Sequence, residues 1–232
     1  MRPSGDTTIT MDEARDLVAD QALWPLVRDF LWDFAPSIHE SWINEQFGNA
    51  KPLNLQTSPR IKKFILDSLQ VEPCFHTFPK DDGSRLLLLD GATLESLVKW
   101  LGALACSDAL RKVTDGATVR ALKTALPGVY PEVFGFAAYF GKWKVGSGEW
   151  KVNGTDAGDK VIAVGHKILF SVLASLPAQL LRRLELKLPQ NIRTSDADTA
   201  SEVPNSQLSI FNFQFIAKLL KLRFPEAYAL CC

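Results

Sequence analysis

Apolar residues recur three and four positions apart along most of the chain, which is the spacing of amphipathic helices. Helix-starting signals precede several of these segments, among them Ser58-Pro59, Asp90 and Asp115. The pattern predicts helices at about 10–20, 23–34, 37–47, 60–69, 90–106, 107–113, 115–126, 131–140, 159–176, 177–186 and 205–223. Residues 131–140 are apolar nearly all round, so we expect that helix to be buried.

Two short stretches have a different pattern. The β-prone runs CFHTF and RLLLL, at 74–78 and 85–89, flank a turn that contains glycine, which predicts a hairpin. Alternatively, RLLLL is only the lead-in to the next helix. A second hairpin is expected at 143–152, where Trp143 and Trp150 lie in two W-K-V runs around Gly-Ser-Gly. Its tryptophans either form an exposed contact site or fold back onto the helical body.

The polar segments complete the expected architecture. Residues 1–9 are expected to be disordered, and the Ser-, Thr- and Asp-rich segment at about 191–204 is a loop or linker. Hydrophobic residues make up 47% and charged residues 22%, enough apolar material for a sizeable core. The predicted fold class is therefore mainly α. We expect a single irregular helical domain over residues 10–232, with one or two short β-hairpins.

Several features indicate a cytoplasmic protein. The N-terminus has no apolar run typical of a secretory signal. The longest apolar stretch, 161–176, is too short to span a bilayer and contains His166 and Lys167. The four cysteines show no disulfide framework and no metal-ligand spacing, which suits a reducing compartment.

Charge is balanced overall but unevenly distributed. The net charge is zero, so nothing indicates a nucleic-acid partner. Residues 1–50 carry nine Asp or Glu and three Lys or Arg, whereas residues 160–232 carry nine Lys or Arg and five Asp or Glu. These regions are either solvated helix faces or two oppositely charged docking faces.

No catalytic constellation is visible in the sequence. Nucleotide-binding glycine loops, the G-x-S-x-G elbow, H-E-x-x-H and C-x-x-C are all absent. The three histidines are His39, His76 and His166, and each occupies an ordinary helix or strand position. The carboxylate pairs at 81–82 and 196–198 lie in turn-like loops. The sequence therefore predicts no catalytic residue, no cofactor and no metal.

Three blocks of the chain resemble one protein family. The first, 97–140, contains a Leu-Gly step at Leu101-Gly102 and then ALRK at 109–112. The second, 169–189, joins an apolar helix through a proline to RRLELKLP, and the third is the C-terminal amphipathic helix ending in KLLKLRFPEAYALCC. In order and spacing these blocks resemble the type III secretion accessory proteins of the SctK/YscK family.

The resemblance implies a non-catalytic role. Members of that family are cytoplasmic adaptors in the sorting platform of the injectisome, at the cytoplasmic face of the inner membrane. They link the forkhead-associated-like cytoplasmic domain of the inner-membrane ring protein to the platform's pod or ring protein. The stator and the export ATPase complete the assembly.

The charged faces supply candidate contact residues for this role. Asp29 and Asp33, one helical turn apart, are expected to meet one partner, and Arg182 and Arg183 the other. The competing interpretations are a secreted effector or an enzyme of unrecognised helical fold, and a small export chaperone.

Overall fold

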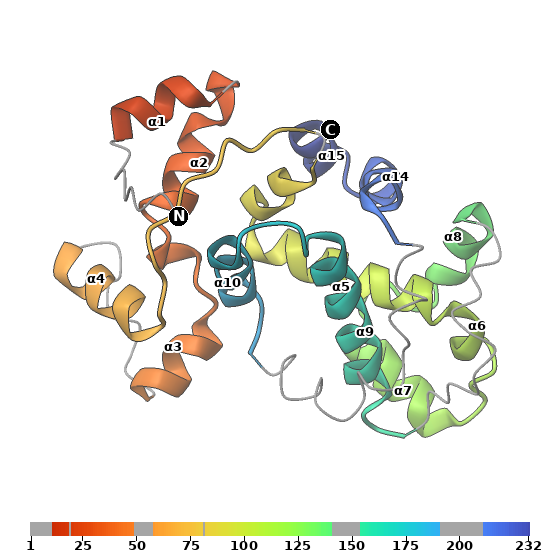
Figure 1. The fold of residues 1–232 in the computed structure, drawn as a ribbon. Coiled ribbons are helices and arrows are strands. Elements are labelled where there is room, and N and C mark those ends of the chain that lie inside the picture. Colours follow the sequence, from red (N-terminus) through yellow and green to blue (C-terminus); the bar gives the residue numbers. More distant parts are fainter. Residues whose placement is uncertain (1–10, 19, 49–57, 81, 141–153, 191–210) are drawn as a thin grey trace, which may run out of the picture.

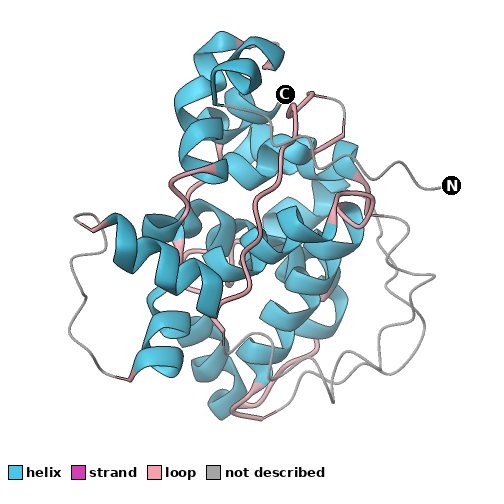
Figure 2. Cartoon of the chain, turned by 60° about the vertical axis from the view of Figure 1, so that its left-hand side comes forward, coloured by secondary structure: helices cyan, strands magenta, loops and turns pink. Residues whose placement is uncertain are grey.

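Helices provide all the regular secondary structure in the part of the chain that the structure describes (Figure 2). The structure is a computed structural model that describes residues 11–18, 20–48, 58–80, 82–140, 154–190 and 211–232. Its α-helices are α1 (Met11–Leu17), α2 (Trp24–Leu31), α3 (Glu40–Phe47), α4 (Pro59–Ser68), α5 (Gly91–Ala105), α6 (Ser107–Leu110), α7 (Gly116–Ala125), α8 (Val133–Phe140), α9 (Ala157–Val172), α10 (Ala178–Lys187), α14 (Phe213–Arg223) and α15 (Pro225–Cys231). Short 3-10 helices are η1 (Gln21–Leu23), η2 (Ala35–Ser37) and η3 (Ser84–Leu88). The mainly α fold class is confirmed.

The hairpin predicted at residues 74–89 is wrong. Residues 71–79 have no regular structure, and RLLL enters η3 instead of a strand. Gly83, at φ +76°, turns the chain, and the Asp82 carboxylate accepts a hydrogen bond from the Ser84 amide at 2.8 Å. The four leucines that follow are all buried, so no polar face is left for a surface strand. The alternative, that RLLLL leads into the next helix, is confirmed; the hairpin expected at 143–152 lies outside the described residues.

The centre of the fold is the pair α5 and α9, which run side by side (Figure 1). Their backbones meet at two glycines. A Cβ atom on Gly102 would lie 1.9 Å from the carbonyl oxygen of Val161, and one on Gly165 would lie 1.9 Å from that of Val98. No side chain fits at either position, so glycine is required for the two helices to approach this closely.

Asx caps fix where several helices begin. Asp90 accepts a hydrogen bond from the Thr93 amide at 2.9 Å, and Asp115 accepts one from the Thr118 amide at 2.7 Å, as their positions predicted. Asn212 caps α14 in the same way, accepting from the Phe215 amide at 3.0 Å. The prediction of one continuous helix from residue 205 is therefore wrong, because Asn212 is extended and α14 begins only at Phe213.

Helix α8 covers the central pair from one side only. Val133 and Ala137 are buried, but Tyr139 is 72% exposed and Gly135 is also exposed. The prediction of burial nearly all round is wrong, because α8 packs on α5 and α6 and leaves its opposite face to solvent.

The C-terminal tail is docked as α15, which packs against α14 and η3 (Figure 1). The guanidinium of Arg85, itself 5% exposed, donates to the carbonyl oxygen of Leu230 at 3.3 Å, and the side chain of Cys231 is fully buried. This contact brings the last helix beside the start of α5 and close to α2. Among the described residues, no helix is long and apolar enough to cross a membrane.

We predict that Gly102→Ala destabilises the protein strongly. The added methyl group would overlap the Val161 carbonyl, so α5 and α9 must separate, which costs about 1–3 kcal/mol or more. Urea denaturation followed by circular dichroism measures this change. The matched control is Gly135→Ala in α8, where a Cβ meets nothing within 4 Å. The control should be neutral or stabilising by up to about 1 kcal/mol; equal effects of the two variants would contradict the close approach.

We predict that mild acid destabilises the fold through His166. This residue on α9 is 9% exposed, and burial lowers its pKa to about 4, while Glu185 opposes the shift. In the unfolded chain the pKa is about 6.5. Between these values the unfolded state binds more protons, so stability falls as the pH falls from 6.5 towards 4.

Urea denaturation of the wild type and of His166→Gln at pH 7 and pH 5 tests this dependence. Between the two pH values the wild type should lose about 2 kcal/mol more than the variant. Parallel losses in the two proteins would show that His166 is not the titrating group.

Candidate functional site

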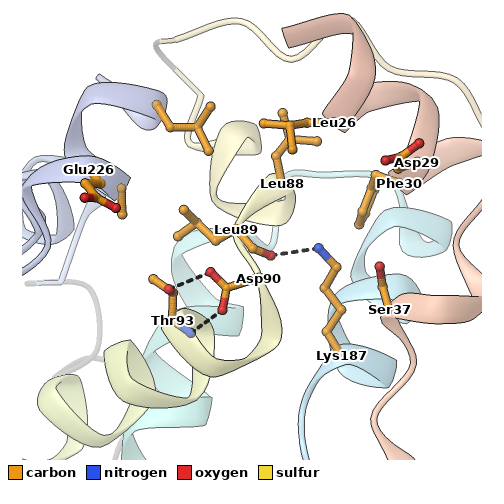
Figure 3. A pocket seen from close by; sticks show the side chains of 12 residues that line it. Leu26, Asp29, Phe30, Ser37, Leu88, Leu89, Asp90, Thr93, Lys187 and Glu226 are labelled. Carbon is orange, nitrogen blue, oxygen red and sulfur yellow. Dashed lines mark hydrogen bonds between the residues drawn. The ribbon is translucent and has the colours of Figure 1, made fainter.

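A cavity of about 390 Å³ lies where α2, η3, the start of α5, the end of α10 and α15 meet (Figure 3). We call it the α2–α15 pocket. Its apolar lining includes Leu26, Leu88, Leu89 and Leu230. The volume falls within the range of about 300–1,000 Å³ that is usual for binding pockets. The rim reaches solvent, since Leu26 is 40% exposed.

Three carboxylates surround this pocket. Figure 3 shows Asp29 and Glu226 on opposite sides, with Asp90 between them. Partial burial alone would raise the pKa of Asp90, but hydrogen bonds from the hydroxyl and amide of Thr93 hold it below the ordinary value. Asp29 forms an exposed ion pair with Arg28 at 2.7 Å. Glu226 lies in the first turn of α15 and has no ion pair within the described residues.

The base of the pocket holds a buried cation, Lys187, which is 5% exposed. Its Nζ donates to the carbonyl oxygens of Leu87 at 2.7 Å and Leu89 at 2.8 Å, and it lies 5.0 Å from the ring centre of Phe30. Burial lowers the pKa of Lys187 to about 8, and the nearby Asp90 opposes that shift. The ammonium is therefore mostly charged at neutral pH and ties α10 to the residues that end η3.

The two arginines predicted as a docking pair occupy different environments. Arg183 is 2% exposed, and its guanidinium donates to the carbonyl oxygens of Phe30 at 2.7 Å and Glu72 at 3.1 Å. Arg182 is half-buried; it donates to the carbonyl of Leu69 and lies 5.1 Å from the ring of Trp42. The structure thus uses Arg183 inside the molecule, where no partner reaches it.

The two acidic residues that were predicted as contacts also lie in different environments. Asp29 borders the α2–α15 pocket, whereas Asp33 pairs with Lys62 of α4 at 2.7 Å and does not line the pocket. The predicted contact residues Trp143 and Trp150 lie outside the described residues. Of the predicted contact residues that the structure describes, Asp29, Asp33, Arg182 and Arg183, only Asp29 lines this pocket.

Comparison with known proteins identifies the chain's relatives. A family model described as YOP proteins translocation protein K (YscK) matches residues 28–231. The chain belongs to the YscK family. No curated protein and no solved structure matches it. Membership associates the protein with type III secretion, protein transport and virulence, in a family of accessory proteins that is not a known enzyme family.

The YscK match and the geometry explain part of the sequence resemblance. Gly102 of the Leu-Gly step is where α5 touches α9, so that step is a packing requirement. The matched range also contains Asp29, Asp90, Lys187 and Glu226 of the pocket. Leu26 precedes it.

Sequence reasoning missed most of this pocket. The sequence marks Asp90 only as a helix-starting signal and Lys187 only as one residue of the RRLELKLP block. Glu226 lies in the FPEAYALCC tail, beyond the last predicted helix. The one available signal was a lysine among apolar residues in LELKLP, which indicates burial and needs oxygen partners. Nothing local could show that α2 and α15 meet, because almost 200 residues separate Asp29 from Glu226.

The chemistry of the pocket suits recognition. Its groups are carboxylates, hydroxyls and one ammonium on apolar walls, and the ammonium is already hydrogen-bonded to main-chain oxygens. Within the described residues there is no cluster of three or more His, Cys, Asp or Glu side chains that could hold a metal ion.

We predict that Arg183→Met lowers the free energy of unfolding by about 3 kcal/mol, because the buried carbonyl of Phe30 and the partly buried carbonyl of Glu72 lose their donor. Urea denaturation measures the loss. Arg120→Met, at an exposed position of α7, is the matched control and should change stability by no more than about 0.5 kcal/mol. A small effect at Arg183 would contradict its internal role.

Proposed function

We propose that this YscK-family protein is a non-catalytic adaptor of the type III secretion injectisome. In this proposal it links the cytoplasmic domain of the inner-membrane ring protein to the pod or ring protein of the sorting platform. It acts at the cytoplasmic face of the inner membrane, within the secretion apparatus. Through these contacts it connects indirectly to the stator and the export ATPase and is needed for effector secretion.

The observation that carries the proposal is the family match over residues 28–231. It is supported by a helical body with a pocket of recognition chemistry at its edge. An adaptor needs at least two separate contact surfaces. The α2–α15 pocket and its acidic border offer one of them.

The acidic side of α2 is the proposed contact with one partner. The Arg28–Asp29 pair is half-exposed on both sides, and such a pair contributes at most about 1 kcal/mol. An incoming cation can therefore replace Arg28 at little cost. Asp33 is already paired with Lys62, so it contributes to binding mainly through the electrostatic potential around α2. Binding by Trp143 and Trp150 stays a prediction.

The direct test is co-purification of the protein with two cognate proteins in separate experiments. One is the cytoplasmic domain of the inner-membrane ring protein, and the other is the platform ring protein. An adaptor should bind each of them. In cells carrying the apparatus, it should fractionate with the basal body and not appear in the medium.

Charge reversal sharpens this test. Asp29→Lys with Asp33→Lys should weaken binding to one partner by about tenfold, and the exposed control Asp67→Lys should not. A folded wild type that binds neither protein, or that accumulates in the medium, would instead favour a secreted effector.

A further inference from the structure

We propose that the α2–α15 pocket binds a segment of a partner protein in which a lysine or arginine lies next to an aliphatic side chain. This inference rests on the proposed adaptor function and adds to it the site and the chemistry of its occupant.

The carboxylates indicate that the occupant carries a positive charge. Asp29, Asp90 and Glu226 reach the pocket from three different helices or helix starts (Figure 3). Glu226 has no ion pair among the described residues, and the partner of Asp29 is its exposed neighbour Arg28. Lys187, the one cation among the described residues that line the pocket, is directed to main-chain carbonyls. A basic side chain entering between Asp29 and Glu226 would meet complementary charge on both sides.

The apolar walls of the pocket favour an occupant that carries an apolar group beside its cation. Leu26 stands at the rim, 40% exposed, above the leucines at the end of η3. Leu230 of α15 adds to the apolar lining. An aliphatic side chain placed here would remove Leu26 from water, and burial of apolar surface contributes about 25 cal/mol per Å².

Lys187 distinguishes a polypeptide from simpler ligands. An ammonium has three N–H donors, and two of these have carbonyl acceptors in the described structure. The third is available to an oxygen atom of the occupant, such as a main-chain carbonyl. A free polyamine offers no acceptor for the third N–H of Lys187, while a free anion would be repelled by three carboxylates. A protein segment supplies the cation, the apolar group and the carbonyl together.

The experiment measures the affinity of the full-length protein for the two cognate proteins named above, by calorimetry at low and high salt. Two pocket variants are compared, Leu26→Gln and the double variant Asp29→Asn with Glu226→Gln. The matched controls are Leu222→Gln, at a leucine of α14 that is 45% exposed, and Asp67→Asn with Asp108→Asn, at exposed positions elsewhere. Circular dichroism verifies that each variant is folded.

For one of the two partners, the double variant should bind about tenfold more weakly and with a shallower dependence on salt. Leu26→Gln should weaken binding by about fivefold, and the controls should stay within about twofold. A photo-crosslinking amino acid at position 26 should capture a segment of that partner containing lysine or arginine.

The contrary outcomes separate the two proposals. If the wild type binds but the pocket variants bind equally well, the pocket proposal is overturned and the adaptor proposal stands. A captured segment without a basic residue also overturns it. If the folded wild type binds neither protein, both proposals fail.

Discussion

The contact between α5 and α9 is the constraint on which the rest of the fold depends. With Gly102 and Gly165 facing carbonyl groups of the opposite helix, the two backbones touch where these residues meet. Gly158 extends the same arrangement towards α7, where an added Cβ would lie 2.1 Å from that of Ala125. Packing this close leaves no free volume, so an added methyl group has to displace a whole helix. Helices α6, α7 and α8 pack directly on the pair, so their positions follow from this spacing.

Helix α10 connects the N-terminal helices to that centre through polar groups. Arg183 donates to the carbonyl of Phe30 in α2, and Lys187 donates to carbonyls at the end of η3. In the opposite direction, the indole of Trp42 in α3 donates to the carbonyl of Leu188 at 2.9 Å. Irregular chain around short helices leaves buried carbonyls that need donors, and long cationic side chains reach them. The same contacts place α2 and η3 at the distance that leaves the pocket open.

The sequence predicted what depends on neighbouring residues. Helical periodicity and the caps at Asp90 and Asp115 placed most helices close to their observed bounds, because these signals act within one turn. It failed where tertiary contacts decide: RLLLL turned into η3, and α8 kept Tyr139 in solvent. For the candidate site, the acidic charge of the N-terminal region pointed to Asp29, whereas the basic charge of the C-terminal region made Arg183 look like a surface residue. Its burial is set by carbonyls of Phe30 and Glu72, more than 100 residues away in the chain.

The make-up of the pocket has a thermodynamic consequence for an adaptor. Its walls come from the second helix, the chain leading into α5, the end of α10 and the last helix, so an occupant contacts several separate elements at once. The last helix is joined to the chain leading into α5 by the hydrogen bond from Arg85 to the carbonyl of Leu230. A ligand that binds only the assembled arrangement stabilises it in proportion to its occupancy. Docking of α15 and binding of a partner would therefore reinforce each other, and a loosened C-terminal helix would weaken the partner's site without altering any residue that touches it.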